Sequence, residues 1–307
     1  MPDAPSQWTV RTLLAWAKGW LERKGVESPR LDAELLLAHA LQCDRVKLYV
    51  DHDKPLSPDE LGKLKPLLSR RAEREPVAHI LGKKEFYGRS FAVGPGVFVP
   101  RPETELLVQH ALEAMQQSAA GVDSGGAASI AGAPAEAGLR ALDLCAGSGA
   151  IGVTLAAERA DLTVDLVEMS PEAAVYTRKN AAALGGGRAH VFDGDLYAPL
   201  GLADARYAAI VSNPPYIPAP DEAGLAPEIT RYEPRLALYA GARGLDVLQN
   251  VIASAPRWLR PGGFFGVEID PSQAAEVVSL CAAAGLVGAR VVQDLSKTDR
   301  FVLAKGA

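Results

Sequence analysis

The stretch ALDLCAGSGAIG, residues 141–152, decides the fold of this chain. Its first part, residues 141–145, is apolar apart from one acid and predicts a buried strand. The glycine-rich part that follows is typical of a turn into a helix whose N-terminus approaches a ligand. A strand, such a turn and a helix together predict the first βα unit of an open, mainly parallel sheet.

Downstream of this unit, strand and helix patterns alternate, which predicts an α/β fold. Further strands are expected at 163–167, 189–192, 207–211 and 263–269, with helices at 171–184, 244–258 and 272–284. The last two strands, 288–294 and 299–304, are joined by a short polar segment and are expected to pair antiparallel.

The strand at 207–211 leads into Ser212 and then Asn213, Pro214, Pro215 and Tyr216. The prolines have fixed φ and no N–H, and they restrict the residues before them, so this strand end is stiff. Hydrogen-bond acceptors outnumber donors there, which suits a flat group that bears an NH2. Asn213 and a proline carbonyl would each accept one N–H, and Tyr216 would cover the planar face. The lone pair of an amide or ring amino nitrogen is delocalised, which makes the nitrogen a poor nucleophile. Hydrogen bonds to both of its hydrogens orient that lone pair toward an electrophile. The alternative is a tight proline turn without a function.

Residues 1–75 are expected to form a small helical bundle, because caps recur there and Leu and Trp follow helical spacing. Pro66 is expected to kink or divide its helix. The bundle carries no catalytic signal and precedes a catalytic domain, which suggests a substrate-recognition module.

Residues 76–101 are expected to form a β-hairpin linker, built from Val77–Gly82 and from short apolar runs on either side of Gly88. The next segment turns from a strand into a helix that begins at Pro102. Helix capping explains much of this corner, yet Phe98, Arg101 and Thr104 are also candidates to line a pocket.

Residues 102–307 are assigned to the catalytic domain. Within them, residues 118–138 form a composition break in which sixteen of twenty-one residues are Ala, Gly or Ser. We expect a flexible surface insertion there rather than a domain boundary.

The composition limits the class of protein. The chain has 307 residues, a formal charge of −5 and 48% hydrophobic residues, which predicts a globular protein with a full core. The acidic balance argues against general nucleic-acid binding. Three dispersed cysteines without a C-x-x-C pattern indicate neither a disulfide framework nor a metal site. No apolar run is long enough to span a bilayer, and the N-terminus lacks a signal-peptide pattern, so a soluble cytoplasmic protein is expected.

The glycine-rich turn leaves two cofactors open. Residues 147–152 match G-x-G-x-x-G, and Glu168 lies 19 residues beyond Gly149, which makes a nicotinamide dehydrogenase a serious candidate. Three features favour S-adenosylmethionine instead. Asp143 precedes the turn and could meet the cationic methionine portion or order the loop. The acidic segment Asp193–Asp195 could cover the adenine edge. The stiff end of the 207–211 strand lies where open α/β sheets bind ligands.

On these residues the sequence resembles the protein-glutamine N5-methyltransferases that modify peptide-chain release factors, the PrmC/HemK family. The resemblance covers nearly the whole chain and is carried by five segments: 28–36 (SPRLDAELL), 98–105 (FVPRPETE), 142–149 (LDLCAGSG), 211–217 (VSNPPYI) and 233–238 (EPRLAL). Asn-Pro-Pro-Tyr alone marks amino-group methyltransferases generally, and its combination with the other segments is more specific.

The resemblance implies a seven-stranded class I methyltransferase domain, Rossmann-like, behind a helical N-terminal domain. It implies that the chain transfers a methyl group from S-adenosyl-L-methionine, leaving S-adenosyl-L-homocysteine, to the glutamine of a Gly-Gly-Gln motif in class 1 release factors. The residues expected at the cofactor are Asp143, Cys145, Ala146, Gly147, Ser148, Gly149, Glu168, Asp195, Leu196 and Asn213. Those expected at the substrate are Asn213, Pro214, Pro215, Tyr216, Phe98 and Arg101, and Asn213, Pro214 and Tyr216 among them are expected to be catalytic. No metal, membrane or direct nucleic-acid contact is expected.

Rival functions remain open at this point. Methylation of a ribosomal-protein glutamine would use the same chemistry. A DNA or RNA amino-group methyltransferase would share the Asn-Pro-Pro-Tyr motif, flip a base into the pocket and need a basic surface. A cofactor-binding regulator without enzyme activity would not need the amide-binding acceptors of the Asn-Pro-Pro-Tyr segment.

Overall fold

The structure, a computed structural model, describes residues 7–120, 138–201 and 207–307. The chain divides into two compact units. The helical unit consists of residues 1–83 together with 226–232, and the sheet unit consists of residues 84–225 and 233–307. Residues 121–137, most of the Ala/Gly/Ser-rich segment 118–138, lie outside the described residues.

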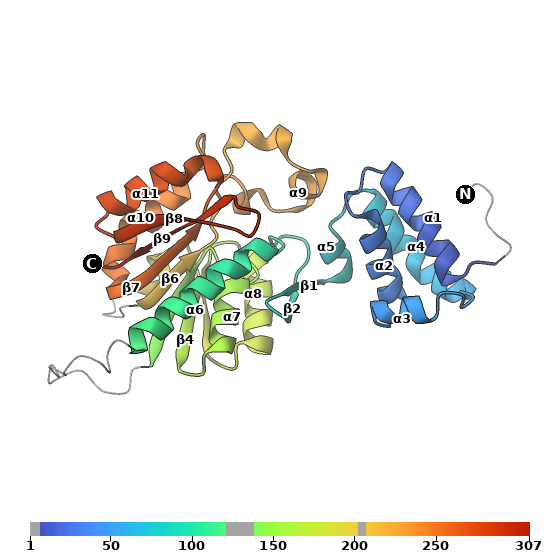
Figure 1. The fold of residues 1–307 in the computed structure, drawn as a ribbon, viewed down its shortest axis with the longest axis horizontal. Helices are drawn as coiled ribbons and strands as arrows, with labels where there is room; N and C mark the ends of the chain where they lie inside the picture. The colour runs from blue at the N-terminus through green and yellow to red at the C-terminus, as the bar shows by residue number, and fades with distance from the viewer. Residues whose placement is uncertain (1–6, 121–137, 202–206) are drawn as a thin grey trace. The chain divides into compact units, whose positions relative to one another are not determined.

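The helical unit contains α1 (Val10–Arg23), α2 (Pro29–Ala40), α3 (Arg45–Val50), α4 (Pro58–Ala72) and α5 (Val77–Leu81), blue to cyan in Figure 1. A capping box begins α4 at Ser57, as the sequence predicts, and Thr9 caps α1 in a second capping box. Pro29 is the first residue of α2, but the Ser28 side chain makes no capping hydrogen bond. Leu21, Leu36 and Leu37 are at most 1% exposed and centre the core of this unit.

One expectation for this unit is wrong, and one is wrong in part. Residues Val77–Leu81 form the helix α5 rather than a strand. Ile80 packs into the helical core, and Gly82, with φ of 69°, ends the helix in the left-handed conformation. Pro66 does not divide its helix, since α4 runs without a break from Pro58 to Ala72. Leu64 and Leu68 are both buried, one on each side of the proline, and their packing favours a continuous helix.

A short helix from far along the chain completes the helical unit. This helix, α9 (Pro227–Tyr232), is held by Glu228, which accepts hydrogen bonds from both Arg71 (2.9 Å) and Arg74 (2.6 Å at each oxygen). Arg71 is 5% exposed and also donates to Asp32 at 2.6 Å. Removing one member of a buried charge cluster leaves another uncompensated, at a typical cost of about 3–5 kcal/mol. Residues 226–232 are therefore a firmly bound part of this unit.

The sheet unit is built on seven strands in the order β5-β4-β3-β6-β7-β9-β8. Their bounds are β3 Leu139–Leu144, β4 Leu162–Glu168, β5 Ala189–Asp193, β6 Tyr207–Ser212, β7 Leu259–Glu268, β8 Val287–Gln293 and β9 Asp299–Lys305. Strands β3 to β7 pair parallel, and β9 pairs antiparallel with both β7 and β8. This confirms the α/β class and the antiparallel closing pair.

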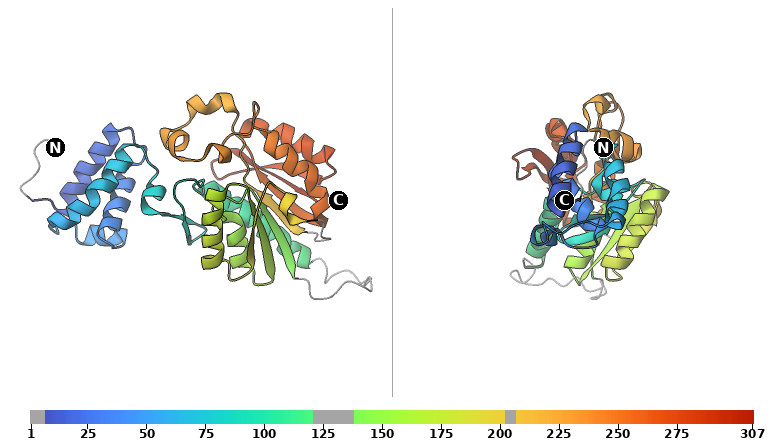
Figure 2. Two further views of the ribbon diagram at one scale, coloured as in Figure 1. Left: turned by 180° about the vertical axis from the view of Figure 1, so that it is seen from behind. Right: turned by 90° about the vertical axis from the view of Figure 1, so that its right-hand side faces the viewer.

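Helices cover both faces of this sheet (Figures 1 and 2). On one face α6 (Glu105–Ala120), α7 (Ala150–Glu158) and α8 (Pro171–Leu184) share a hydrophobic core with the strands. On the other face, α10 (Asp246–Trp258) and α11 (Ala274–Ala283) form a second core. A two-stranded hairpin, β1 (Lys83–Phe86) with β2 (Arg89–Ala92), contributes Phe86 and Phe91 to the first core, so the predicted hairpin is present.

The register of the sheet brings four strand ends into one row. Leu144 pairs with Val167 on one side and with Ser212 on the other, and Ser212 pairs with Val267. The next residues, Glu168, Cys145, Asn213 and Glu268, therefore follow one another along the carboxyl edge of the sheet. From β3 the chain continues to β4 and β5 on one side of the sheet, and then crosses to β6 on the other side of β3. The row of strand ends therefore lies where the strand order reverses, which is the point at which such sheets bind ligands.

Candidate active site

The glycine-rich turn after β3 is shaped by backbone conformations that favour glycine. Gly147 and Gly149 have φ of 57° and 79°, and Cys145 has φ of 58°. A Cβ on Gly152 would lie 2.9 Å from the Asp143 side chain, so glycine is required for this close packing. The turn leads directly into α7 at the edge of the sheet.

Asp143 lies beneath this turn rather than in the cavity. Its Oδ2 accepts the N–H of Gly152 at 2.8 Å, and its Oδ1 has no hydrogen-bond partner among the described residues. Burial raises the pKa of this carboxyl to about 7. Of the two roles open from the sequence, the geometry supports ordering of the loop.

Glu168 joins the glycine-rich turn to the start of α8. Its two carboxylate oxygens accept the N–H of Gly147 and the N–H of Ser170, both at 2.7 Å. Burial raises the pKa of Glu168, and the backbone hydrogen bonds partly oppose that rise. A carboxylate has about four lone-pair sites, so both oxygens can accept further hydrogen bonds from a ligand.

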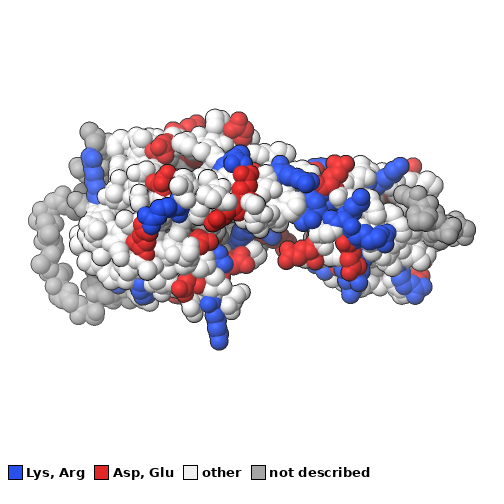
Figure 3. Space-filling view, turned by 90° about the horizontal axis from the view of Figure 1, so that it is seen from above, with Lys and Arg blue, Asp and Glu red and all other residues white. Residues whose placement is uncertain are grey.

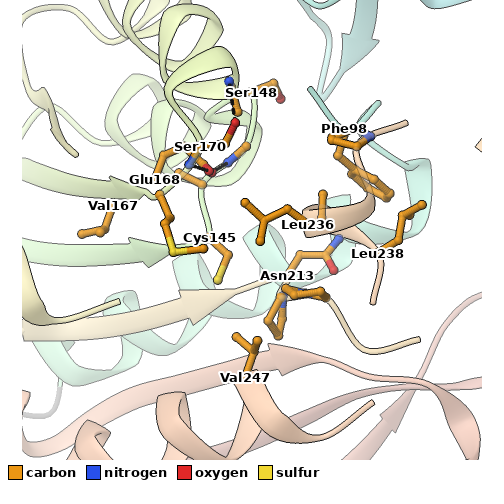
Figure 4. Close-up of a pocket in the computed structure, with 18 of the residues that line it drawn as sticks. Phe98, Cys145, Ser148, Val167, Glu168, Ser170, Asn213, Leu236, Leu238 and Val247 are labelled. Carbon is orange, nitrogen blue, oxygen red and sulfur yellow. Dashed lines mark hydrogen bonds between the residues drawn. The ribbon is translucent and has the colours of Figure 1, made fainter. Parts of the chain in front are cut away.

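A cavity runs along this edge of the sheet. Figure 4 shows Cys145, Glu168 and Ser170 on one side and Phe98, Leu236 and Leu238 on the other, with Asn213 between them. The predicted site residues that line the cavity are Cys145, Ala146, Gly147, Ser148, Glu168, Asp195, Leu196, Phe98 and Asn213–Tyr216. Asp143, Gly149 and Arg101 do not line it.

The Asn-Pro-Pro-Tyr segment presents acceptors to this cavity. The Asn213 Nδ2 donates to Thr104 Oγ1 at 3.3 Å, whereas its Oδ1 has no partner among the described residues. The Pro214 carbonyl likewise accepts no hydrogen bond from the described part of the chain. The carbonyl of Tyr216 is held by Gln273 Nε2 at 2.9 Å, and the Tyr216 hydroxyl donates to Glu268 at 3.2 Å.

Arg101 supports the mouth of the cavity from behind. Its guanidinium lies 4.5 Å from the centre of the Phe98 ring and donates to both oxygens of Glu233 at 2.8 and 2.9 Å. Glu233 is 5% exposed and begins the segment that lines the cavity from Pro234 to Tyr239. Arg101 thus ties Phe98 to that segment.

Several lining residues were not predicted from the sequence. Met169, Pro234, residues 236–239 and Val247 line the cavity, and Glu268 lies behind it. Glu268 could have been found by the signal that identified Glu168, an acid that ends an apolar strand. Among the residues that the structure describes, no cluster of His, Cys, Asp and Glu could hold a metal ion, and no helix is long and apolar enough to cross a membrane.

The fold and this site define a class I methyltransferase. A family model described as "Methyltransferase small domain" matches residues 112–228, and one described as "PrmC N-terminal domain" matches residues 12–82. A release factor glutamine methyltransferase of Geobacter sulfurreducens is 42% identical over 302 residues, which cover 98% of each chain. One of Mycolicibacterium smegmatis is 38% identical over 298 residues, which cover 96% of this chain and 97% of that one. The chain belongs to the release factor glutamine methyltransferase family.

These relatives confirm the resemblance and exclude the dehydrogenase alternative. A solved structure, the hMettl16 catalytic domain with an RNA hairpin, matches 78% of this chain and 81% of its own with a TM-score of 0.55 and 16% identity. At that identity the match concerns the fold alone.

Proposed function

We propose that this chain transfers a methyl group from S-adenosylmethionine to the side-chain amide nitrogen of a glutamine in peptide-chain release factors. The observation that carries the proposal is the pair of free acceptors, Asn213 Oδ1 and the Pro214 carbonyl, on a cavity that also reaches the glycine-rich turn. A primary carboxamide has two N–H donors, which match these two acceptors.

The lining of the cavity fits S-adenosylmethionine. Glu168 retains free lone pairs for ribose hydroxyls, Asp195 offers an acceptor for the adenine amino group, and Met169 and Leu196 offer apolar contacts to the base. The turn from Cys145 to Ser148 leaves room for the methionine portion beside α7. When bound, this cofactor supplies an electrophilic methyl group on a sulfonium.

The residues of this chain then act by positioning. Asn213 and Pro214 accept the two amide hydrogens, Tyr216 packs over the amide plane, and the lone pair of the nitrogen is directed toward the cofactor side of the cavity. Phe98, Leu236 and Leu238 make the side of the cavity opposite Glu168 apolar. This side excludes water and strengthens the hydrogen bonds between the substrate amide and its two acceptors. Methyl transfer would form the N–C bond as the S–C bond of the sulfonium breaks, leaving S-adenosylhomocysteine. The methylated nitrogen is strongly acidic, so it would lose its proton to solvent and no dedicated general base is needed.

The acceptor protein is inferred from the relatives, which are named for release factor glutamine, and from the resemblance, which implies a Gly-Gly-Gln motif. The direct test is to incubate the chain with labelled S-adenosylmethionine and purified class 1 release factors, and to locate the label by mass spectrometry. Label is expected on the motif glutamine, and none on a matched release factor whose glutamine is replaced by glutamate. In a parallel incubation with purified ribosomal proteins, label on one of them and none on the release factors would contradict this substrate assignment.

A nucleic-acid substrate is less well supported. Figure 3 shows Lys and Arg side chains gathered on one face of the helical unit, with Asp and Glu beside them. The net charge of −5 nevertheless disfavours a basic surface over the whole protein.

We assign recognition of the protein substrate to the helical unit, which exposes unusual apolar side chains. Val46 and Val50, one turn apart on α3, are 72% and 73% exposed. Replacing both by serine is expected to raise KM for a whole release factor about tenfold, because contact area is lost, and to leave KM for a short Gly-Gly-Gln peptide unchanged. Val175→Ser, on a valine of the sheet unit that is 62% exposed, serves as the control. Equal KM values for the double variant and the control on the whole protein would refute this role.

A further inference from the structure

A buried carboxyl group lies directly behind the amide-binding residues. Glu268 ends β7, is 2% exposed and does not line the cavity itself. Its Oε2 accepts the hydroxyl proton of Thr104 at 2.6 Å, and its Oε1 accepts that of Tyr216 at 3.2 Å. Buried Glu268 therefore fixes the hydroxyl groups of both Thr104 and Tyr216 by hydrogen bonds.

This acid decides what Thr104 can offer to Asn213. A threonine hydroxyl has a single proton, and Thr104 is 3% exposed, so that proton goes to Glu268 and not to water. The Thr104 oxygen can then only accept from Asn213, which places Nδ2 against Thr104 at 3.3 Å. The Asn213 Oδ1 is consequently directed away from Thr104, toward the cavity.

We propose that Glu268 and Thr104 are positioning residues that fix the Asn213 amide with its oxygen toward the substrate, and thereby select a carboxamide over a carboxylate. The proposal rests on the function proposed above. A glutamine side chain brings two N–H donors to the two acceptors. A glutamate brings only oxygen lone pairs, which Asn213 Oδ1 and the Pro214 carbonyl repel. If the Asn213 amide turned over, its NH2 would face the cavity and this preference would weaken.

Protonation of Glu268 would remove the constraint, because a neutral carboxyl can donate to Thr104. Burial raises the pKa of Glu268, and its bond from Thr104, the charge of Arg300 and its bond from Tyr216 oppose the rise. Glu103 is the further charged group near it and adds to the rise. Activity that needs the ionised form is present above the pKa of Glu268 and is lost as pH falls through it.

The test compares Glu268→Gln, Thr104→Val and Thr104→Ser in the full chain, with the exposed Glu113→Gln as control. Glu268→Gln replaces one acceptor by an NH2 group, so the Thr104 proton loses its obligate acceptor. Thr104→Val keeps the shape and removes the hydroxyl, whereas Thr104→Ser keeps the hydroxyl. Glu268→Gln and Thr104→Val are each expected to lower kcat about tenfold or more, with the Kd for S-adenosylmethionine changed less than about twofold. Thr104→Ser is expected to restore most of the rate.

Three readouts separate positioning from simple loss of structure. The acidic limb of the kcat–pH profile should disappear in Glu268→Gln. The preference for a Gly-Gly-Gln peptide over a Gly-Gly-Glu peptide, measured by competition, should narrow at least about fivefold. The side-chain NH2 signals of Asn213, assigned by nitrogen-15 NMR against Asn213→Ala, should shift in Thr104→Val and not in Glu113→Gln.

Unchanged Asn213 signals in Thr104→Val, or wild-type kcat and peptide preference in Glu268→Gln, would overturn the proposal. Failure of the proposed function is a different result, namely no methyl transfer to any glutamine by the unsubstituted chain. The NMR comparison decides the orientation of Asn213 in either case.

Discussion

Replacing Asn213 by alanine is expected to lower kcat for methyl transfer by about a hundredfold to a thousandfold while leaving S-adenosylmethionine binding intact. The change removes one of two acceptors that orient the amide nitrogen, and losing a single preorganised polar group at a reacting centre typically has an effect of that size. Steady-state kinetics with the acceptor protein gives kcat, and calorimetric titration gives the cofactor Kd.

Asn250, an exposed residue on α10, provides the control for this substitution. Asn250→Ala should behave as the unsubstituted chain in both measurements. Near-normal turnover by Asn213→Ala would mean that the amide is held elsewhere, and the assignment of the Asn-Pro-Pro-Tyr segment would fail with it.

Replacing Gly244 by alanine is expected to destabilise the sheet unit by about 3–5 kcal/mol and to abolish activity. Gly244 has φ of 70°, and a Cβ built on it would lie 2.0 Å from the Tyr216 carbonyl oxygen. That oxygen belongs to the backbone and is held by Gln273, so it cannot move without displacing the Asn-Pro-Pro-Tyr segment. Urea denaturation of the full chain measures the loss in free energy of unfolding.

Gly288→Ala separates the two causes of this effect. Gly288 has φ of 66°, but a Cβ there meets nothing within 4 Å, so backbone strain of about 1–2 kcal/mol is the expected cost. If both variants lost the same stability, the close approach of Gly244 to Tyr216 would not matter.

The amino-acid pattern is sufficient to predict the sheet and many of the residues that line the cavity. Apolar runs bounded by glycine, proline and acids mark strand ends, and residues at the ends of parallel strands meet at one edge. That is why Glu168, Asp195 and Asn213, distant in the chain, could be placed together before the structure was known. The start of α8 at Pro171 fits Ser170 as its cap and proline as its first residue.

Other features depend on tertiary contacts that local pattern does not record. The segment Val77–Leu81 is short and apolar, and such runs suit a strand or a helix equally until a core selects one. Pro66 shows the same effect, because packing of its neighbours outweighs its local preference. The position of Glu268 at a strand end could be read from the sequence, but its pairing with Thr104, 164 residues away in the chain, could not.

The placement of residues 226–232 has a consequence for how this protein can be dissected and how it can evolve. The backbone passes between the two units three times, after residues 83, 225 and 232. Cleavage after residue 83 would therefore leave α9 in the fragment that carries the sheet. Arg74 would then lose Glu228, and Arg71 would keep only its pair with Asp32. Recombination cannot exchange residues 1–83 alone, because residues 226–232 belong to the same unit. A viable chimera must inherit both pieces from one parent.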